Sequence, residues 1–183
     1  MEKLKEKASA LLTEEYFWAI IENSDKGRNL ENELDKLSEQ ELLGYGYWWD
    51  YFHMKSYNGS LWAVAYIVLG GCSDDGFDYF RFWLLARGKE VYMKAIQNAD
   101  SLSNEFENLT DDEYPEQEEL DYVPNKVFQK KFNKNFNDAK ESNLNYREIS
   151  RPAITFEWNE DDEESIRKIC PKTFDRWWGN DVF

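Results

Sequence analysis

Residues 61–88 read LWAVAYIVLGGCSDDGFDYFRFWLLARG, and this stretch decides the fold. Residues 61–69 are apolar nearly all round, a pattern typical of a helix that is buried on every side. The glycine pair at 70–71 favours a left-handed turn at its end, and Ser60 can cap its start. A second helix is predicted over 74–87, because its basic last turn is followed by a glycine. Two packed helices therefore form the expected centre of the molecule.

Helical spacing of apolar residues continues on both sides of this stretch. It predicts further helices over 14–24, 29–52, 90–97, 123–136, 165–170 and 171–178. Ser38 followed by Glu41 matches a capping box, which predicts a break inside the second of these helices. Residues 154–158 alternate in the manner of a strand, so one short extended segment is allowed there. We therefore expect an all-α fold, an irregular multi-helix bundle of about six to eight helices.

The composition favours one self-sufficient domain. The chain of 183 residues contains eight Trp, eleven Tyr and twelve Phe, enough apolar area for a core without a disulfide or metal. Its two cysteines have no metal-binding spacing, and no cofactor motif is found. The longest apolar run is too short to span a bilayer, and the charged N-terminus lacks a signal-peptide pattern. We expect a single cytoplasmic, reduced domain over residues 1–183, without a cofactor.

The charge is strongly unbalanced, because 37 acidic residues against 22 basic ones give a net charge of −15. Such a chain is repelled by phosphate backbones and by anionic lipid, so direct binding to nucleic acid or membrane is not expected. Residues 95–125 contain no Lys or Arg, which predicts an exposed acidic loop at about 103–121. The lysines expected to face this loop are Lys126, Lys130, Lys131 and Lys134. The negative charge either attracts a basic partner or keeps an aromatic-rich protein in solution.

The segment GGCSDDGFDYFRFWL at 70–84 resembles a bacterial family of unknown function, DUF4240. Shorter matches are TEEYFW at 13–18, LWA at 61–63, GKEVY at 88–92 and NADSL at 98–102. The resemblance covers about residues 13–135, with a weaker echo at 156–158 and 171. It implies a mostly helical, cytosolic bacterial domain with its core at about 13–135 and a C-terminal extension at about 137–183. It brings no catalytic residues, because the family has none assigned.

The residues best suited to binding gather at the start of the predicted helix 74–87. In a functional interpretation, Asp74 and Asp75 bind a cation or a basic group, while Arg81 holds an anionic one. In a structural interpretation, Asp75 caps the helix, and Asp78 pairs with Arg81 one turn later. The structural interpretation is favoured, since every residue then has a local role. The candidate functional corner consists of Ser73, Asp74, Asp75, Asp78, Arg81 and His53, and no metal site is assigned.

His53 is the only histidine, so any histidine chemistry depends on it. Asp50 lies one helical turn before it and could orient the ring, while Cys72 or Ser73 would have to supply a nucleophile. No nucleophile motif supports this arrangement, so we assign no catalytic residue.

Two other sets of residues are candidates for partner binding. The aromatic run over 45–57 is too dense for one helix stripe, and part of it is expected to face another helix group, a partner or a groove. The pair Trp177–Trp178 is suited either to docking a partner or to clamping the C-terminal segment. The candidate partner-binding residues are Trp48, Trp49, Trp177, Trp178, Asp111, Asp112 and Glu113.

Three functions of different classes remain. The favoured one is a non-catalytic protein-interaction or regulatory module that binds a protein, a basic one being one option, through its acidic and aromatic surface. A sharper alternative is an immunity-type neutraliser of a basic toxin or nuclease, in which 111–121 and 160–164 mimic phosphate charge. The third is an enzyme, metal-assisted in one form, centred on Asp74, Asp75, Asp78 and Arg81. The sequence leaves the partner, the substrate and the oligomeric state open.

Overall fold

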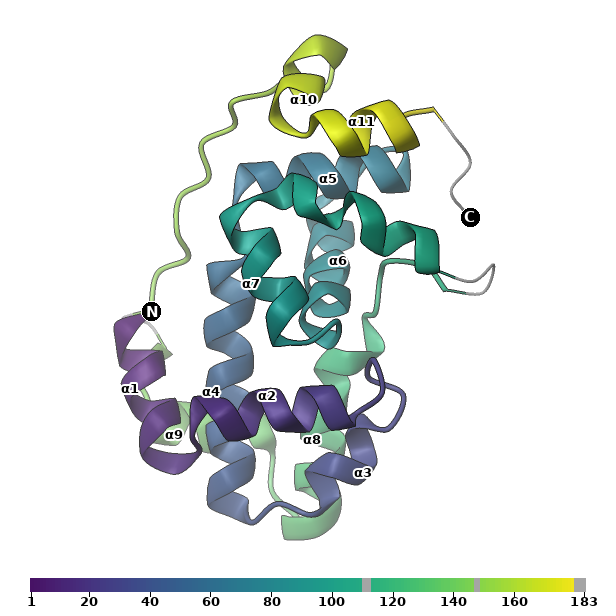
Figure 1. Ribbon diagram of the computed structural model, residues 1–183. Helices are drawn as coiled ribbons and strands as arrows, with labels where there is room; N and C mark the ends of the chain where they lie inside the picture. The colour runs from purple at the N-terminus through teal and green to yellow at the C-terminus, as the bar shows by residue number, and fades with distance from the viewer. Residues whose placement is uncertain (110–112, 147–148, 180–183) are drawn as a thin grey trace.

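A long helix, α4 (Glu39–Lys55), runs through the middle of the molecule, and other helices pack around it (Figure 1). The structure is a computed structural model that describes residues 1–109, 113–146 and 149–179. These residues form twelve helices and no strand, which confirms the predicted all-α fold. Within the same residues, no helix combines the length and the apolar character needed to cross a membrane.

The chain order is simple. Before α4 come α1 (Glu2–Leu11), α2 (Glu14–Asn23) and α3 (Leu30–Asp35). After it come α5 (Gly59–Leu69), α6 (Asp74–Ala86), α7 (Lys89–Gln97) and the 3-10 helix η1 (Ala99–Asn108). The last four are α8 (Glu119–Phe132), α9 (Phe136–Asn143), α10 (Glu163–Ile169) and α11 (Pro171–Trp177). Residues 149–156 have no regular secondary structure, so the short extended segment allowed at 154–158 is not part of a strand.

Short polar side chains determine where the helices begin. The predicted break is confirmed, since Ser38 and Glu41 form a capping box that starts α4. Two predicted caps were wrong. Asn58, and not Ser60, accepts a hydrogen bond from the backbone nitrogen of Leu61 at 3.0 Å, so α5 begins earlier than expected. Ser73, and not Asp75, caps α6. In both cases the residue directly before the first helical residue takes the role.

The aromatic residues of α4 are core residues. Trp48 and Trp49 are 1% and 3% exposed, so the prediction that they bind a partner was wrong. The Nε1 atom of Trp48 donates to the carbonyl oxygen of Leu12 at 2.8 Å, and the ring of Trp49 stacks on Phe82 with centroids 5.6 Å apart. So many aromatic side chains can be buried on one helix because α1, α2, α6, α8 and α9 all contact α4 and cover several of its faces.

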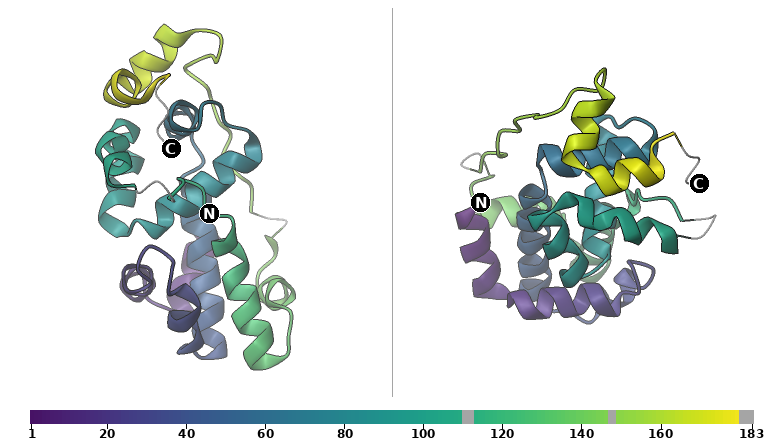
Figure 2. Two further views of the ribbon diagram at one scale, coloured as in Figure 1. Left: turned by 90° about the vertical axis from the view of Figure 1, so that its right-hand side faces the viewer. Right: turned by 45° about the horizontal axis from the view of Figure 1, so that its top comes forward.

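The predicted acidic loop is shorter than expected. Its first part forms the end of η1, and α8 begins four residues before the predicted helix start at 123. The lysines of α8 were predicted to face the acidic stretch before it, and this prediction was wrong. Instead α8 lies alongside α3 and α4 (Figure 2), where Lys126 pairs with Glu31 at 2.6 Å and Lys134, just after α8, pairs with Glu39 at 2.7 Å. These ion pairs therefore form because helices that are far apart in the sequence pack against each other.

Two groups of helices lie at opposite ends of the molecule (Figure 1). At one end α10 and α11 pack on α5, and at the other α9 packs on α4 and α8. The chain between α9 and α10 runs along one side of the molecule and joins these ends. We call residues 140–151, the end of α9 and the start of this connecting chain, the side segment; its described residues are 140–146 and 149–151.

Candidate functional site

A polar cleft of about 390 Å³ opens where the C-terminal half of α4 meets α6, α9 and the side segment. We call it the cleft. It contains His53, Asp78 and Arg81, which are half of the predicted functional corner. The residues that line it are Asp50, His53, Met54, Tyr57, Asp78, Arg81, Phe82, Asp121, Asn137, Lys140, Glu141, Tyr146 and Arg151.

Arg81 is the most firmly held residue of the cleft, with only 1% of its surface exposed. Its Nη1 atom donates to the carbonyl oxygen of His53 at 2.6 Å, and its Nε atom to that of Phe77 at 3.3 Å. Its Nη2 atom donates to the carboxylate of Asp78, which confirms the predicted pair one helical turn apart. The guanidinium lies 4.9 Å from the ring centroids of Tyr57 and Phe77. Burial lowers the pKa of Arg81 to about 9, so the group stays charged near neutral pH.

His53 is held as a neutral ring. It stacks on Phe82, with centroids 4.4 Å apart, and its Nε2 atom is buried without a hydrogen-bond partner. The nearest carboxylate oxygen, Oδ1 of Asp78, is 3.9 Å away, which is too far for a hydrogen bond. Burial, followed by the charges of Arg81 and Arg151, holds the pKa of His53 well below its usual range. The imidazole therefore offers a neutral nitrogen at neutral pH.

Asp50 forms a second polar group in the cleft. Its Oδ2 atom accepts hydrogen bonds from Nζ of Lys140 at 2.9 Å and from the hydroxyl of Tyr146 at 2.8 Å. The hydroxyl of Tyr47 in turn donates to the carbonyl oxygen of Lys140 at 2.9 Å. Burial, with the charge of Asp50, raises the pKa of Tyr146 above its usual range, so this phenol remains a donor. Asp50 thus binds the side segment, and the prediction that it orients His53 is not supported by these contacts.

Arg151 completes the cleft at its outer edge. Its Nη2 atom lies 3.6 Å from Oδ2 of Asp78, and its guanidinium is 5.4 Å from the ring centroid of Tyr57. Its side chain is 58% exposed, so it lies at the mouth of the cleft. Asp50 on α4 and Asp78 on α6 are therefore each met by a cation of the side segment, Lys140 and Arg151 respectively.

The other half of the predicted corner lies outside the cleft lining. Ser73 accepts a hydrogen bond from the backbone nitrogen of Gly76 at 3.2 Å, while Asp74 and Asp75 are exposed in the first turn of α6. Cys72 is likewise outside the lining, and burial raises the pKa of its thiol to about 12, which leaves it protonated. Neither proposed nucleophile faces His53. Among the described residues, no group of three or more His, Cys, Asp or Glu could hold a metal ion.

Sequence reasoning missed the residues that complete the cleft: Lys140, Tyr146 and Arg151. They lie 90 or more positions from Asp50, and their local sequence has no periodic or motif signal. The only signal that could have found them is their chemistry: in a chain with an excess of carboxylates, a basic or phenolic side chain is expected to pair with one of them.

The remaining partner-binding candidates have intramolecular contacts. The Nε1 atom of Trp177 donates to the carbonyl oxygen of Ser103 at 3.0 Å, and Trp178 stacks on Phe174 at 4.9 Å, so both tryptophans hold the C-terminal helices. Glu113 is half-buried and pairs with Arg28 at 3.1 Å. Asp111 and Asp112 lie outside the described residues.

Comparison with known families gives one match. Residues 12–130 match the family model described as "Protein of unknown function (DUF4240)". No curated protein and no solved structure matches the chain in the corresponding searches. The matched region contains Asp50, His53, Asp78 and Arg81 of the cleft, whereas the cations that meet the two carboxylates from outside lie beyond it.

Proposed function

The chain belongs to the DUF4240 family, and we propose that it is a non-catalytic binding module whose cleft takes cationic side chains of a basic protein partner. The observation that carries the proposal is the pairing of Asp50 with Lys140 and of Asp78 with Arg151. Two carboxylates of the family-matched region already hold two cations of the segment that follows it. A partner with two suitably spaced basic side chains would meet the same chemistry.

The charges of the molecule support this choice of partner. A net charge of −15 attracts basic proteins over a range of about one Debye length, roughly 10 Å at moderate salt. Inside the cleft the ring of Tyr57 stacks with the guanidinium of Arg151, an additional favourable contact for a visiting arginine. To bind, such a partner must displace Lys140 from Asp50 and Arg151 from Asp78.

The test uses the full chain and a fluorescein-labelled oligo-arginine peptide, with binding followed by fluorescence anisotropy. The double variant Asp50→Asn with Asp78→Asn should bind the peptide about tenfold more weakly, a loss of about 1.4 kcal/mol. The matched control, Glu163→Gln with Glu164→Gln, removes the same charge from exposed positions of α10 and should change affinity less. Equal losses in the two variants would reduce the effect to net charge and refute a role for the cleft. Because Asp78→Asn also removes a partner of Arg81, circular dichroism and the single Asp50→Asn variant accompany it.

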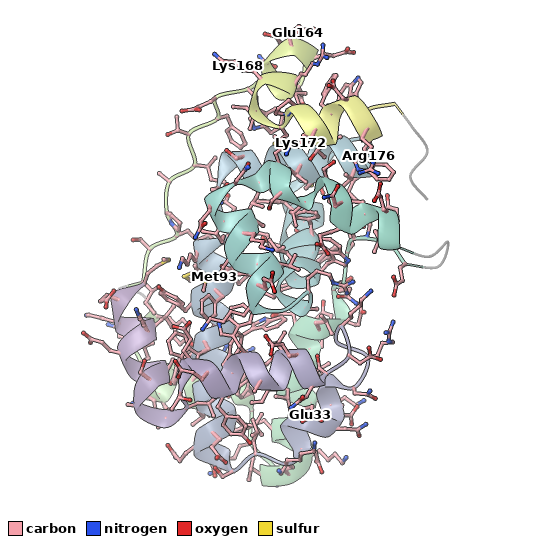
Figure 3. The ribbon with its side chains drawn as sticks, viewed as in Figure 1. Glu33, Met93, Glu164, Lys168, Lys172 and Arg176 are labelled. Atoms are coloured by element: carbon pink, nitrogen blue, oxygen red, sulfur yellow. The ribbon has the colours of Figure 1, made fainter. Side chains whose placement is uncertain are left out.

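A second pair of variants tests the competition directly. Replacing Lys140 and Arg151 by alanine should tighten peptide binding, because Asp50 loses Lys140 and Asp78 loses Arg151, although Asp78 keeps Arg81. The control is Lys168→Ala with Lys172→Ala, which changes the net charge by the same amount on α10 and α11, where Figure 3 labels both residues. If the control tightens binding as much as the cleft variant does, the side segment does not compete for the site.

A second candidate function, the neutraliser of a basic toxin or nuclease, is favoured by one surface observation. Residues 160–164 are five consecutive acidic residues, all exposed, and Figure 3 shows Glu164 at the outer edge of α10. If Glu163→Gln with Glu164→Gln weakens peptide binding more than the cleft variant, this surface is the binding site and the second candidate replaces the first.

A further inference from the structure

Unpaired polar atoms gather at a second cavity, of about 260 Å³, at the other end of α6. In the part of the chain that the structure describes, six buried side-chain nitrogen or oxygen atoms lack a hydrogen-bond partner. Three of them belong to residues that line this cavity: Trp83 Nε1, Arg87 Nε and Gln117 Oε1. Because roughly 90% or more of buried polar groups are hydrogen-bonded, three such atoms around one cavity call for an explanation.

Two of these atoms are donors on one face of α6. Trp83 and Arg87 are four residues apart, and the guanidinium of Arg87 lies 5.0 Å from the ring centroid of Trp83. Trp83 is only 1% exposed, so water does not reach its indole nitrogen freely. Burial lowers the pKa of Arg87 to about 10, which leaves it cationic at neutral pH. Unlike the Arg81 guanidinium, the Nε atom of Arg87 has no hydrogen-bond partner among the described residues.

The third atom is an acceptor held in place by the backbone. The backbone nitrogen of Gln117 donates to the carbonyl oxygen of Tyr79 at 3.2 Å, and its Nε2 atom donates to that of Lys26 at 3.2 Å. Its Oε1 atom is thereby left for another donor. Lys26 itself has a positive φ of 56°, an uncommon conformation for a residue with a side chain, so the loop that holds Gln117 is itself specifically shaped.

The charges around the cavity are balanced. Three cations face three carboxylates: the lining contains Lys26, Arg28, Arg87, Glu113, Glu116 and Glu119. Glu113 already pairs with Arg28 at 3.1 Å and with Lys26 at 4.0 Å. A balanced wall favours a zwitterion over a phosphate, which would need a surplus of cations. The volume lies below the range of about 300–1,000 Å³ that is typical of drug-sized ligands, so the ligand is small.

We propose that this second cavity binds a free α-amino acid. The carboxylate of the amino acid would accept hydrogen bonds from Arg87 Nε and Trp83 Nε1, and its ammonium group would donate to Gln117 Oε1. Each of the three unpaired atoms would then have a partner of the matching kind. The site is separate from the cleft and goes beyond the function proposed for it.

The experiment follows the indole N–H signals of the ¹⁵N-labelled full chain while each of the common L-amino acids is added to about 10 mM, enough to detect millimolar affinity. Trp83→Phe assigns the signal of Trp83. That signal should shift in a saturable manner with at least one amino acid, whereas the indole signal of Trp177, which already donates to Ser103, should not move.

Arg87→Lys keeps the charge but removes the Nε–H donor, and it should weaken the binding about tenfold or more. The matched control is Arg176→Lys, since Arg176 also stacks on a tryptophan, 5.4 Å from the ring of Trp177, but lies away from the cavity. Asp50→Asn with Asp78→Asn should leave amino-acid binding unchanged, which separates this site from the cleft. The proposal is overturned if no amino acid shifts the Trp83 signal, or if Arg87→Lys and Arg176→Lys bind equally well.

Discussion

Arg81 and Arg87 lie on the same helix region and are both largely buried, yet their surroundings differ completely. Arg81 donates to two carbonyl oxygens and a carboxylate and lies against two neighbouring aromatic rings. Arg87 stacks on one ring, and its Nε atom has no partner among the described residues. A buried charge that is fully hydrogen-bonded holds elements together, whereas one left unpaired costs free energy unless a ligand or solvent pairs with it. The predictions below test this contrast between a structural and a receptive arginine.

Arg81→Met should give the largest loss of stability. It leaves the Asp78 carboxylate without its closest cation and removes the guanidinium donor from two carbonyl oxygens, so we expect the free energy of unfolding to fall by about 3–5 kcal/mol. Urea denaturation followed by circular dichroism measures it. A loss below about 1 kcal/mol would contradict a structural role for Arg81.

The pH dependence of stability tests the surroundings of His53, which lies beside Arg81 in the cleft. Because the folded state holds the pKa of this group well below the unfolded value of about 6.5, the unfolded chain binds the proton first as the pH falls. The contribution of neutral His53 is therefore complete above pH 6.5 and declines below it, by at most about 1.4 kcal/mol per pH unit.

The measurement compares urea denaturation of the natural chain and of His53→Gln at about pH 7.5 and about pH 5. Since His53 is the only histidine, the difference between the two slopes isolates its titration from that of the carboxylates. Identical slopes would show that the ring is as easily protonated in the folded state as in the unfolded one.

Tyr146→Phe tests how firmly the side segment is held on the cleft. The variant keeps the ring near Tyr47 but removes the hydroxyl that donates to Asp50 at 2.8 Å, so stability should fall by about 1 kcal/mol. The same substitution in an Asp50→Asn background should cost less, because the two groups act as a pair. Additive losses would contradict a direct interaction.

Arg87→Met should have the smallest effect and completes the contrast with Arg81→Met. The substitution removes a buried charge that has no ion-pair partner, and a methionine can still pack on Trp83, so we expect a change within about 0.5 kcal/mol in ligand-free protein. A loss comparable with that of Arg81→Met would reveal a structural role for Arg87.

The local parts of the fold could be predicted from the sequence. The capping box of Ser38 and Glu41, the left-handed turn at Gly70 and the Asp78–Arg81 pair all depend on residues within four positions of each other, and all are confirmed. The cap of α6 was misplaced by two residues because Ser73, Asp74 and Asp75 are all good caps, and local propensity does not choose among them.

The candidate site was only half predictable, for a physical reason. Asp78 and Arg81 were found because they follow a recognisable helix start, and His53 because it is the only histidine. Lys140 and Tyr146 were not, because their partner Asp50 lies 90 and 96 positions away and only tertiary packing brings them together. The same limit explains the lysines of α8, which pair with Glu31 on α3 and not with the acidic residues next to them.

The course of the side segment also affects the newly made chain. Asp50 and Asp78 belong to helices that leave the ribosome early, whereas Arg151 follows about 70 residues after Arg81. At the usual speed of synthesis, about 5–20 residues per second, this interval is on the order of ten seconds or less. For most of that time Asp50 lacks Lys140, and Asp78 lacks Arg151 and has only Arg81 of its own helix as a partner. A nascent chain therefore exposes these two carboxylates with fewer cations around them than the finished chain provides.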